Sequence, residues 1–167
     1  MHLTSTKEKA ADVRAALDAI RRIVQALRES GREAEAEVGV SGAQLFVLQV
    51  LAQEAPLCLA EVAERTHTHP TSVSVVVKRL VEAGFVARKR AKADARRHEL
   101  ALTKAGRALL AEAPRTAQEQ LVAGLESLTD RERRGLVQGL ARLIDEAGLG
   151  SPTASPPEMF FEEGRKA

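Results

Sequence analysis

Hydrophobic residues near the N-terminus recur at steps of three and four positions, which is the spacing of one face of an α-helix. This pattern predicts a first helix from about residue 7 to residue 29. The following Ser30-Gly31 pair is typical of a helix end, so we expect the helix to stop there. The apolar stripe of this helix is formed by Val13, Leu17, Ile20, Val24 and Leu27.

Capping patterns predict the next three helices. Ser41 and Gln44 fit a capping box that opens a second helix, and Cys58 with Glu61 has the same spacing before a third helix over residues 59–65. Pro70 suits the first position of a fourth helix, which we expect to end at Gly84. The predicted buried stripe of the fourth helix is Val73, Val76, Val77 and Leu80.

The second half of the chain alternates strands and helices. Residues 85–88 and 97–102 read as two short strands around a polar, basic tip. Thr103 caps a fifth helix reaching to about Leu128, which Pro114 should kink or interrupt. Thr129 and Glu132 form another capping box before a sixth helix, and residues 148–167 read as a flexible tail rich in Pro and Ser. The predicted fold is mainly α with one β-hairpin.

Positive charge is concentrated around this hairpin. Residues 78–97 hold eight basic and two acidic side chains, a local charge of +6, whereas the whole chain carries only +2. The rest of the chain is therefore at −4. Such a basic zone on a mildly acidic protein indicates a surface that binds a polyanion.

Two short helices joined by a tight turn suggest how the polyanion is bound, because the second helix can enter a DNA major groove. Burial of Val73, Val77 and Leu80 is expected to turn five residues of the fourth helix outward. These residues are Thr71, Ser72, Val75, Lys78 and Arg79. The hydroxyl groups of Thr71 and Ser72 suit phosphates, and Lys78 and Arg79 suit phosphates or guanine. Val75 can only touch a thymine methyl group.

The residues from 41 to 107 resemble the winged helix-turn-helix of the MarR family of bacterial transcription regulators. The similarity lies in Leu57 to Arg65, Pro70 to Leu80 and Gly84-Phe85-Val86. The wing signature of that family, D-x-R-x(5)-L-T-x-x-G, is matched by Asp94-Ala95-Arg96, Leu102-Thr103 and Gly106.

The resemblance implies a homodimer that binds double-stranded, pseudo-palindromic DNA, usually represses, and releases DNA when a small-molecule effector binds. Residues 1–40 and 108–147 would form the dimerisation region around the DNA-binding domain at 41–107. Arg96 would enter the minor groove, and Asp94 would hold the wing by pairing with Arg88 or Arg97. The expected wing contacts to DNA are Arg88, Arg90, Lys92, Asp94, Arg96 and Arg97.

Three residues depart from the family's pattern. His67 stands where glycine often adopts a left-handed conformation, and His69 stands at the usual Ser/Thr N-cap, so a weak cap is expected. Val75 replaces a long polar reader. The wing tip also has Ala91-Lys92-Ala93 in place of the common proline.

The remaining chemistry is sparse. The lone Cys58 is interpreted as a helix cap, and the alternative is a thiol that senses oxidants. For the protein as a whole, the alternative from a different functional class is a winged helix that serves as a protein-interaction module. We find no catalytic motif, and expect neither an enzyme, a cofactor nor a metal site. The N-terminus lacks a signal-peptide pattern and no segment suits a membrane span, so a cytoplasmic protein is expected. For Met159-Phe160-Phe161 two interpretations are possible: a frayed end of the chain, or a segment that docks on the dimer or on a partner.

Overall fold

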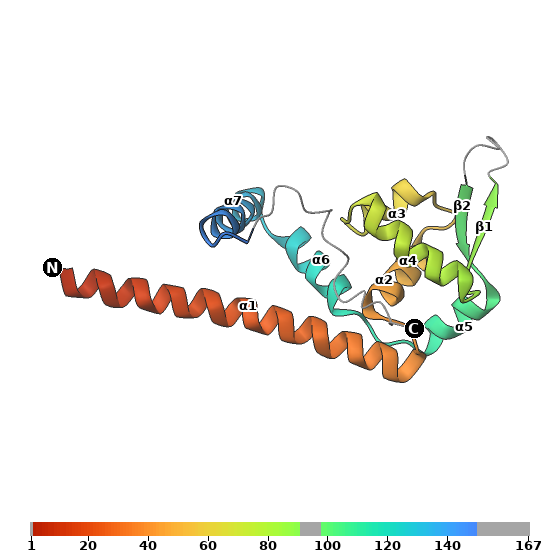
Figure 1. Ribbon diagram of the computed structural model, residues 1–167, viewed down its shortest axis with the longest axis horizontal. Helices are drawn as coiled ribbons and strands as arrows, with labels where there is room; N and C mark the ends of the chain where they lie inside the picture. Colours follow the sequence, from red (N-terminus) through yellow and green to blue (C-terminus); the bar gives the residue numbers. More distant parts are fainter. Residues whose placement is uncertain (1, 91–97, 150–167) are drawn as a thin grey trace.

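The computed structural model describes residues 2–90 and 98–149 of the chain. It is mainly helical with one antiparallel hairpin, as predicted. Figure 1 shows a body of short helices and the hairpin at one end of a long first helix, with α6 and α7 turning back from that body. In chain order the elements are α1 (His2–Val38), α2 (Gly42–Gln53), α3 (Leu59–Arg65), α4 (Pro70–Glu82), β1 (Val86–Arg90), β2 (His98–Leu102), α5 (Lys104–Glu112), α6 (Ala117–Ser127) and α7 (Asp130–Glu146).

Helix α1 does not stop at Ser30-Gly31, so that prediction was wrong. Both residues instead serve tertiary contacts within a continuous helix. The Ser30 hydroxyl accepts a hydrogen bond from the amide of Ala117 at 2.9 Å, and a Cβ at Gly42 would lie only 3.3 Å from the Gly31 Cα. The absence of side chains at Gly31 and Gly42 therefore lets α2 approach α1 closely. The helix ends before Gly39, whose φ of +72° suits glycine.

The core of the winged helix unit, which we define as α2 through β2, lies between its helices and the inner face of the hairpin. Leu48 and Leu51 of α2, Val62 of α3 and Leu80 of α4 are almost fully buried there. All four residues of the predicted α4 stripe are buried, which confirms that prediction. Tertiary packing thus stabilises a helix rich in valine, a residue with middling helix propensity.

The hairpin is anchored on the core through its second strand. The strands pair in antiparallel register from Val86↔Leu102 to Arg90↔His98. On its other side β2 receives one isolated bridge, in which Leu57 and Leu100 exchange backbone hydrogen bonds of 3.1 and 2.7 Å. Strand β2 therefore lies between Leu57 and β1, and β1 is an outer strand.

Pro114 interrupts the predicted fifth helix, which becomes α5 and α6. Sequence reasoning missed Thr116, the N-cap that restarts the helix. Its hydroxyl accepts from the amide of Glu119 at 3.1 Å and donates to Gln49 Oε1 at 3.0 Å. Because Gln49 Nε2 also donates to the Pro114 carbonyl at 3.2 Å, the break between α5 and α6 is tied to α2.

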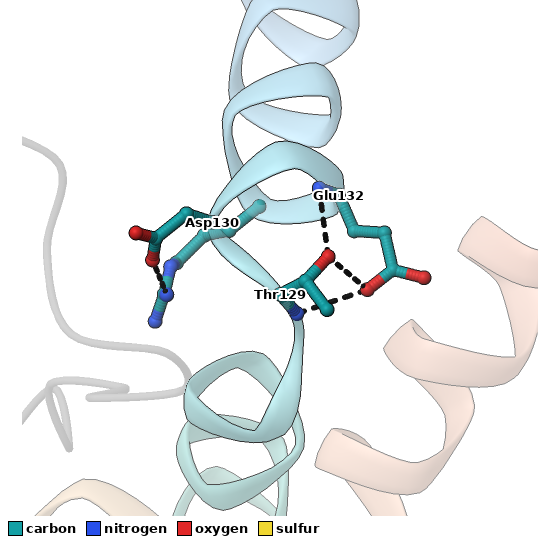
Figure 2. A network of polar contacts seen from close by, with 4 residues as sticks. Thr129, Asp130 and Glu132 are labelled. Atoms are coloured by element: carbon teal, nitrogen blue, oxygen red, sulfur yellow. Dashed lines mark hydrogen bonds and ion pairs between the residues drawn. The ribbon is translucent and has the colours of Figure 1, made fainter.

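Helix α7 begins with the predicted capping box, shown in Figure 2. The Thr129 hydroxyl and amide donate to Glu132 Oε2 at 2.6 and 2.9 Å, and these hydrogen bonds lower the pKa of Glu132. In return, the Glu132 amide donates to the Thr129 hydroxyl at 3.4 Å. Arg133 adds an ion pair with Asp130 at 2.6 Å, so local contacts alone define the start of this helix.

Candidate nucleic-acid interface

The turn between α3 and α4 is fixed by hydrogen bonds from its own threonines. The buried Thr66 hydroxyl donates to the Val62 carbonyl at 2.8 Å, and the Thr68 hydroxyl donates to the Thr66 carbonyl at 2.9 Å. His67 adopts φ +50°, the left-handed conformation that the sequence predicts at this position. This conformation turns the chain sharply between the two helices.

His69 caps α4 with its imidazole ring. Its Nδ1 accepts a hydrogen bond from the amide of Thr71 at 3.3 Å, and Pro70 follows as the first helical residue. The position of this cap is as predicted. The distance is at the long end for an N–H···N contact, in keeping with the weak cap that a histidine is expected to make.

The outward face of α4 differs from the prediction at one residue. Thr71, Val75 and Lys78 are exposed as predicted, and Arg79 is half-buried. Ser72 is only 9% exposed, so its predicted outward orientation was wrong. It lies four positions before Val76 and so shares the buried side of the helix. Ser74, three positions after Thr71 and four before Lys78, is exposed instead and was missed, although this spacing could have identified it.

Three consecutive cations lie on β1 beside this helix. Arg88, Lys89 and Arg90 are all exposed, and β1 packs against α4 (Figure 1). The predicted wing residues Lys92, Asp94, Arg96 and Arg97 lie outside the described residues. On α4, Lys78 Nζ is 3.8 Å from Glu82 Oε1, an exposed pair that another anion can readily replace because it contributes little free energy.

The base of the wing is held by the last two residues of the matched signature. The Thr103 hydroxyl donates to the Gly84 carbonyl at 2.7 Å, and its amide donates to the Phe85 carbonyl at 3.0 Å. Gly106, in the first turn of α5, lies so close that a Cβ there would be 2.2 Å from the Phe85 oxygen. The Leu-Thr-x-x-Gly part of the signature therefore fixes the angle between the hairpin and α5, which follows it in the chain.

A second feature lies between the winged helix unit and α6. A cleft of about 600 Å³ has an apolar floor that includes Phe46 and Val122 and a rim rich in carboxylates. Arg65 forms an ion pair with Glu54 on this rim, and the hydrogen bond between them raises the pKa of Arg65. The remaining lining residues are Gln49, Val50, Gln53, Glu64, His67, Glu119, Ala123 and Glu126.

One contact spans this cleft from the helix-turn-helix to α6. His67 Nε2 in the α3–α4 turn lies 3.5 Å from Glu126 Oε1. Both side chains are largely exposed, so the pair contributes little to the free energy of folding. It nevertheless places the turn that orients α4 in direct contact with α6.

Other chemistry was sought over the same part of the chain. Cys58 occupies the predicted N-cap of α3, half-buried, and its amide donates to Glu61 Oε2 at 2.6 Å. Within residues 2–90 and 98–149, no group of three or more His, Cys, Asp or Glu side chains is arranged to hold a metal ion. No helix in those ranges is both long and apolar enough to span a membrane.

Comparison with known proteins agrees with this geometry. The sequence profile of the MarR family matches residues 38–97. The HTH-type transcriptional regulator ML2140 of Mycobacterium leprae is 32% identical over 111 residues, which cover 65% of this chain and 78% of that protein. The chain belongs to the MarR family. The curated relatives that the chain matches are transcriptional regulators.

Two further similar proteins extend the comparison. The transcriptional repressor MdtR of Bacillus subtilis is 31% identical over 104 residues, which cover 62% of this chain and 65% of MdtR. The chain thus spans slightly less than two thirds of the length of MdtR. The structure of BpsR from Bordetella bronchiseptica superposes with a TM-score of 0.53 at 25% identity, covering 79% of this chain and 91% of that one. That structure was described for a regulator whose DNA binding is controlled by 6-hydroxynicotinic acid.

Proposed function

We propose that this MarR-family protein is a homodimeric repressor that binds pseudo-palindromic operators through α4 and the wing. The observation that carries this proposal is the packing of α4 against β1, which joins the outward face of α4 to three exposed cations in one unit. Helix α4 would enter the major groove. The strands would follow the adjacent backbone and bring Arg88, Arg90 and the wing tip, Lys92 to Arg97, to the minor groove.

Uncovered apolar side chains support the dimer. Large hydrophobic residues on α1 and α7 remain 37 to 62% exposed in the single chain, and monomeric proteins rarely leave apolar surfaces of this extent in water. We assign residues 1–40 and 108–147 to dimerisation and residues 41–107 to DNA binding. The exposed residues are Val13, Leu17, Ile20 and Ile23 on α1, and Leu136, Val137, Leu140, Leu143 and Ile144 on α7.

The cleft between the winged helix unit and α6 is the proposed effector site. Its volume suits a small organic molecule, and its apolar floor with a polar rim is typical of ligand sites. A molecule bound there would separate His67 from Glu126 and so shift the α3–α4 turn relative to α6. Because α6 precedes the proposed dimerisation helix α7, this shift would change the spacing of the two α4 helices.

The dependence of DNA affinity on salt tests the interface. Operator sequences are first selected from a random duplex pool, and the affinity is then measured between 50 and 300 mM salt, on the order of physiological strength. Removing Arg88 and Arg90 together by substitution with Gln eliminates four charges per dimer. If all four contact phosphates, the slope of log K against log salt becomes shallower by roughly 3 to 4.

Lys9→Gln is the control for charge outside the proposed DNA-binding residues, since it removes two exposed positive charges per dimer from the N-terminal part of α1. Its slope should equal that of the wild type. An unchanged slope in the double variant would place the DNA on another surface. For the effector site, Ala123→Leu narrows the cleft and should abolish any ligand-induced release, whereas Ala111→Leu on the surface of α5 should not.

A further inference from the structure

Val75 is distinctive on the surface of the winged helix unit. Among the described residues from α2 to β2 it is the only large hydrophobic side chain that is exposed, with 46% of its surface accessible. The other exposed large hydrophobic residues within the described part of the chain lie on α1, on α7 and at Leu149. Burial in the proposed dimer explains the faces of α1 and α7, but it does not explain a single isopropyl group in the middle of α4.

The exposed neighbours of Val75 in the first two turns of α4 offer little discrimination between bases. Thr71 and Ser74 present short hydroxyl groups, which can donate to or accept from any base edge. Lys78 and Arg79, which suit phosphates or guanine, lie only toward the C-terminal end of the helix. The first two exposed turns of α4 therefore lack the Arg, Asn or Gln side chains that make paired hydrogen bonds to guanine or adenine.

The major groove contains one apolar group that matches an exposed isopropyl, namely the C5-methyl group of thymine. Against any other base edge, Val75 would cover hydrogen-bonding groups and strip them of water without replacing those bonds. Against thymine, two apolar groups leave water together. The side chain thus favours one base by apolar contact and disfavours the other three by desolvation.

We infer that Val75 is a specificity-determining residue that reads a thymine methyl group in each operator half-site. This inference rests on the proposed entry of α4 into the major groove and adds the chemical feature that is recognised there. The methyl group contributes about as much as one buried CH₂, which corresponds to about a fourfold change in affinity per half-site. Both half-sites together give a change on the order of fifteenfold.

Replacing each thymine of the selected operator by uracil, one symmetric pair at a time, tests this directly. Uracil lacks the C5-methyl group and keeps every Watson–Crick hydrogen bond. We expect one thymine pair at which uracil weakens wild-type binding about fifteenfold, and at which the Val75→Ala variant shows no uracil penalty. Ser74→Ala is the matched control, because it changes the adjacent exposed residue and should keep the full penalty.

The outcomes separate this inference from the proposed function. If uracil weakens the wild type at no position, or if Val75→Ala retains the full penalty, then Val75 does not read thymine even though α4 binds DNA. If the random pool yields no enriched duplex for the wild-type dimer, the proposed function fails and the inference fails with it. Equal circular dichroism spectra and melting temperatures for the three proteins confirm that the substitutions leave the fold intact.

Discussion

Gly106 permits a close approach of two backbones, so replacing it with alanine should destabilise the protein. The added Cβ would lie 2.2 Å from the Phe85 oxygen, and Phe85 would have to retreat by about 0.8 Å to reach even 3.0 Å. The Phe85 carbonyl accepts hydrogen bonds from the Thr103 amide at 3.0 Å and from its hydroxyl at 3.2 Å. A displacement of this size breaks or weakens both of them.

The magnitude follows from opposing contributions. Overpacking costs about 1 to 3 kcal/mol and each weakened hydrogen bond about 0.5 to 1.5 kcal/mol. Alanine recovers about 1 kcal/mol over glycine in a helix. The net loss is therefore about 3 kcal/mol, which lowers the melting temperature by about 6 to 12 °C for a chain of this length.

Gly124→Ala makes the same chemical change at a helical site where an added Cβ meets nothing within 4 Å. Here only the gain in helix propensity applies, so the melting temperature should rise by about 2 to 4 °C. Thermal unfolding of both variants is compared with the wild type at one chain concentration, because dimerisation links stability to concentration. Our explanation of the wing anchor is refuted if Gly106→Ala is as stable as the wild type.

Four further predictions concern the wing, the thiol, the α7 cap and the dimer. Arg96→Ala should weaken operator binding without lowering the melting temperature; unchanged affinity would remove Arg96 from the interface. Cys58→Ser should leave stability unchanged or raise it by about 0.5 to 1 kcal/mol, with DNA binding indifferent to peroxide in both proteins; release by peroxide that depends on Cys58 would favour the redox alternative. Hydrogen bonds from Thr129 lower the pKa of Glu132, so they stabilise the fold at pH values above the ordinary pKa of a glutamate. This stabilisation is lost as the pH falls through the lowered pKa, and acid should therefore destabilise the wild type more than Glu132→Gln. Deleting residues 129–167 should give a chain that aggregates or unfolds; a stable, soluble monomer in light scattering would contradict the dimer.

The sequence predicted those elements whose signals are local. The capping boxes at Ser41 and Thr129 are made by residues three positions apart, and both are present as expected. The valine stripe of α4 follows from spacing alone, whereas the left-handed turn at His67 follows from the resemblance to the family, in which glycine often stands there. The family signature also identified Thr103 and Gly106, although only the structure shows that both act on the backbone of the Gly84-Phe85 pair.

One error arose where a distant contact overrides a local signal, and two arose where a local pattern was overlooked. Ser30-Gly31 has the composition of a helix end, yet its serine accepts a hydrogen bond from Ala117, 87 residues away in sequence. Thr116 was missed as an N-cap although Glu119 gives it the same Thr-x-x-Glu spacing as Thr129 and Glu132. The orientation of Ser72 was wrong because the prediction of its outward face omitted Val76 from the stripe that positions the helix. Pattern reading would have corrected this last error.

The outer position of β1 gives its cations a second consequence. Strand β2 is paired on both sides, by Leu57 and by β1, whereas no strand within residues 2–90 and 98–149 pairs with the other edge of β1. Open strand edges recruit strands from other chains, and consecutive like charges discourage such pairing by repulsion. Repulsion between Arg88, Lys89 and Arg90 therefore disfavours edge-to-edge pairing of the free protein, and in the proposed complex DNA would neutralise these charges. Evolution toward weaker DNA binding at this strand would therefore be limited by solubility as well as by regulation.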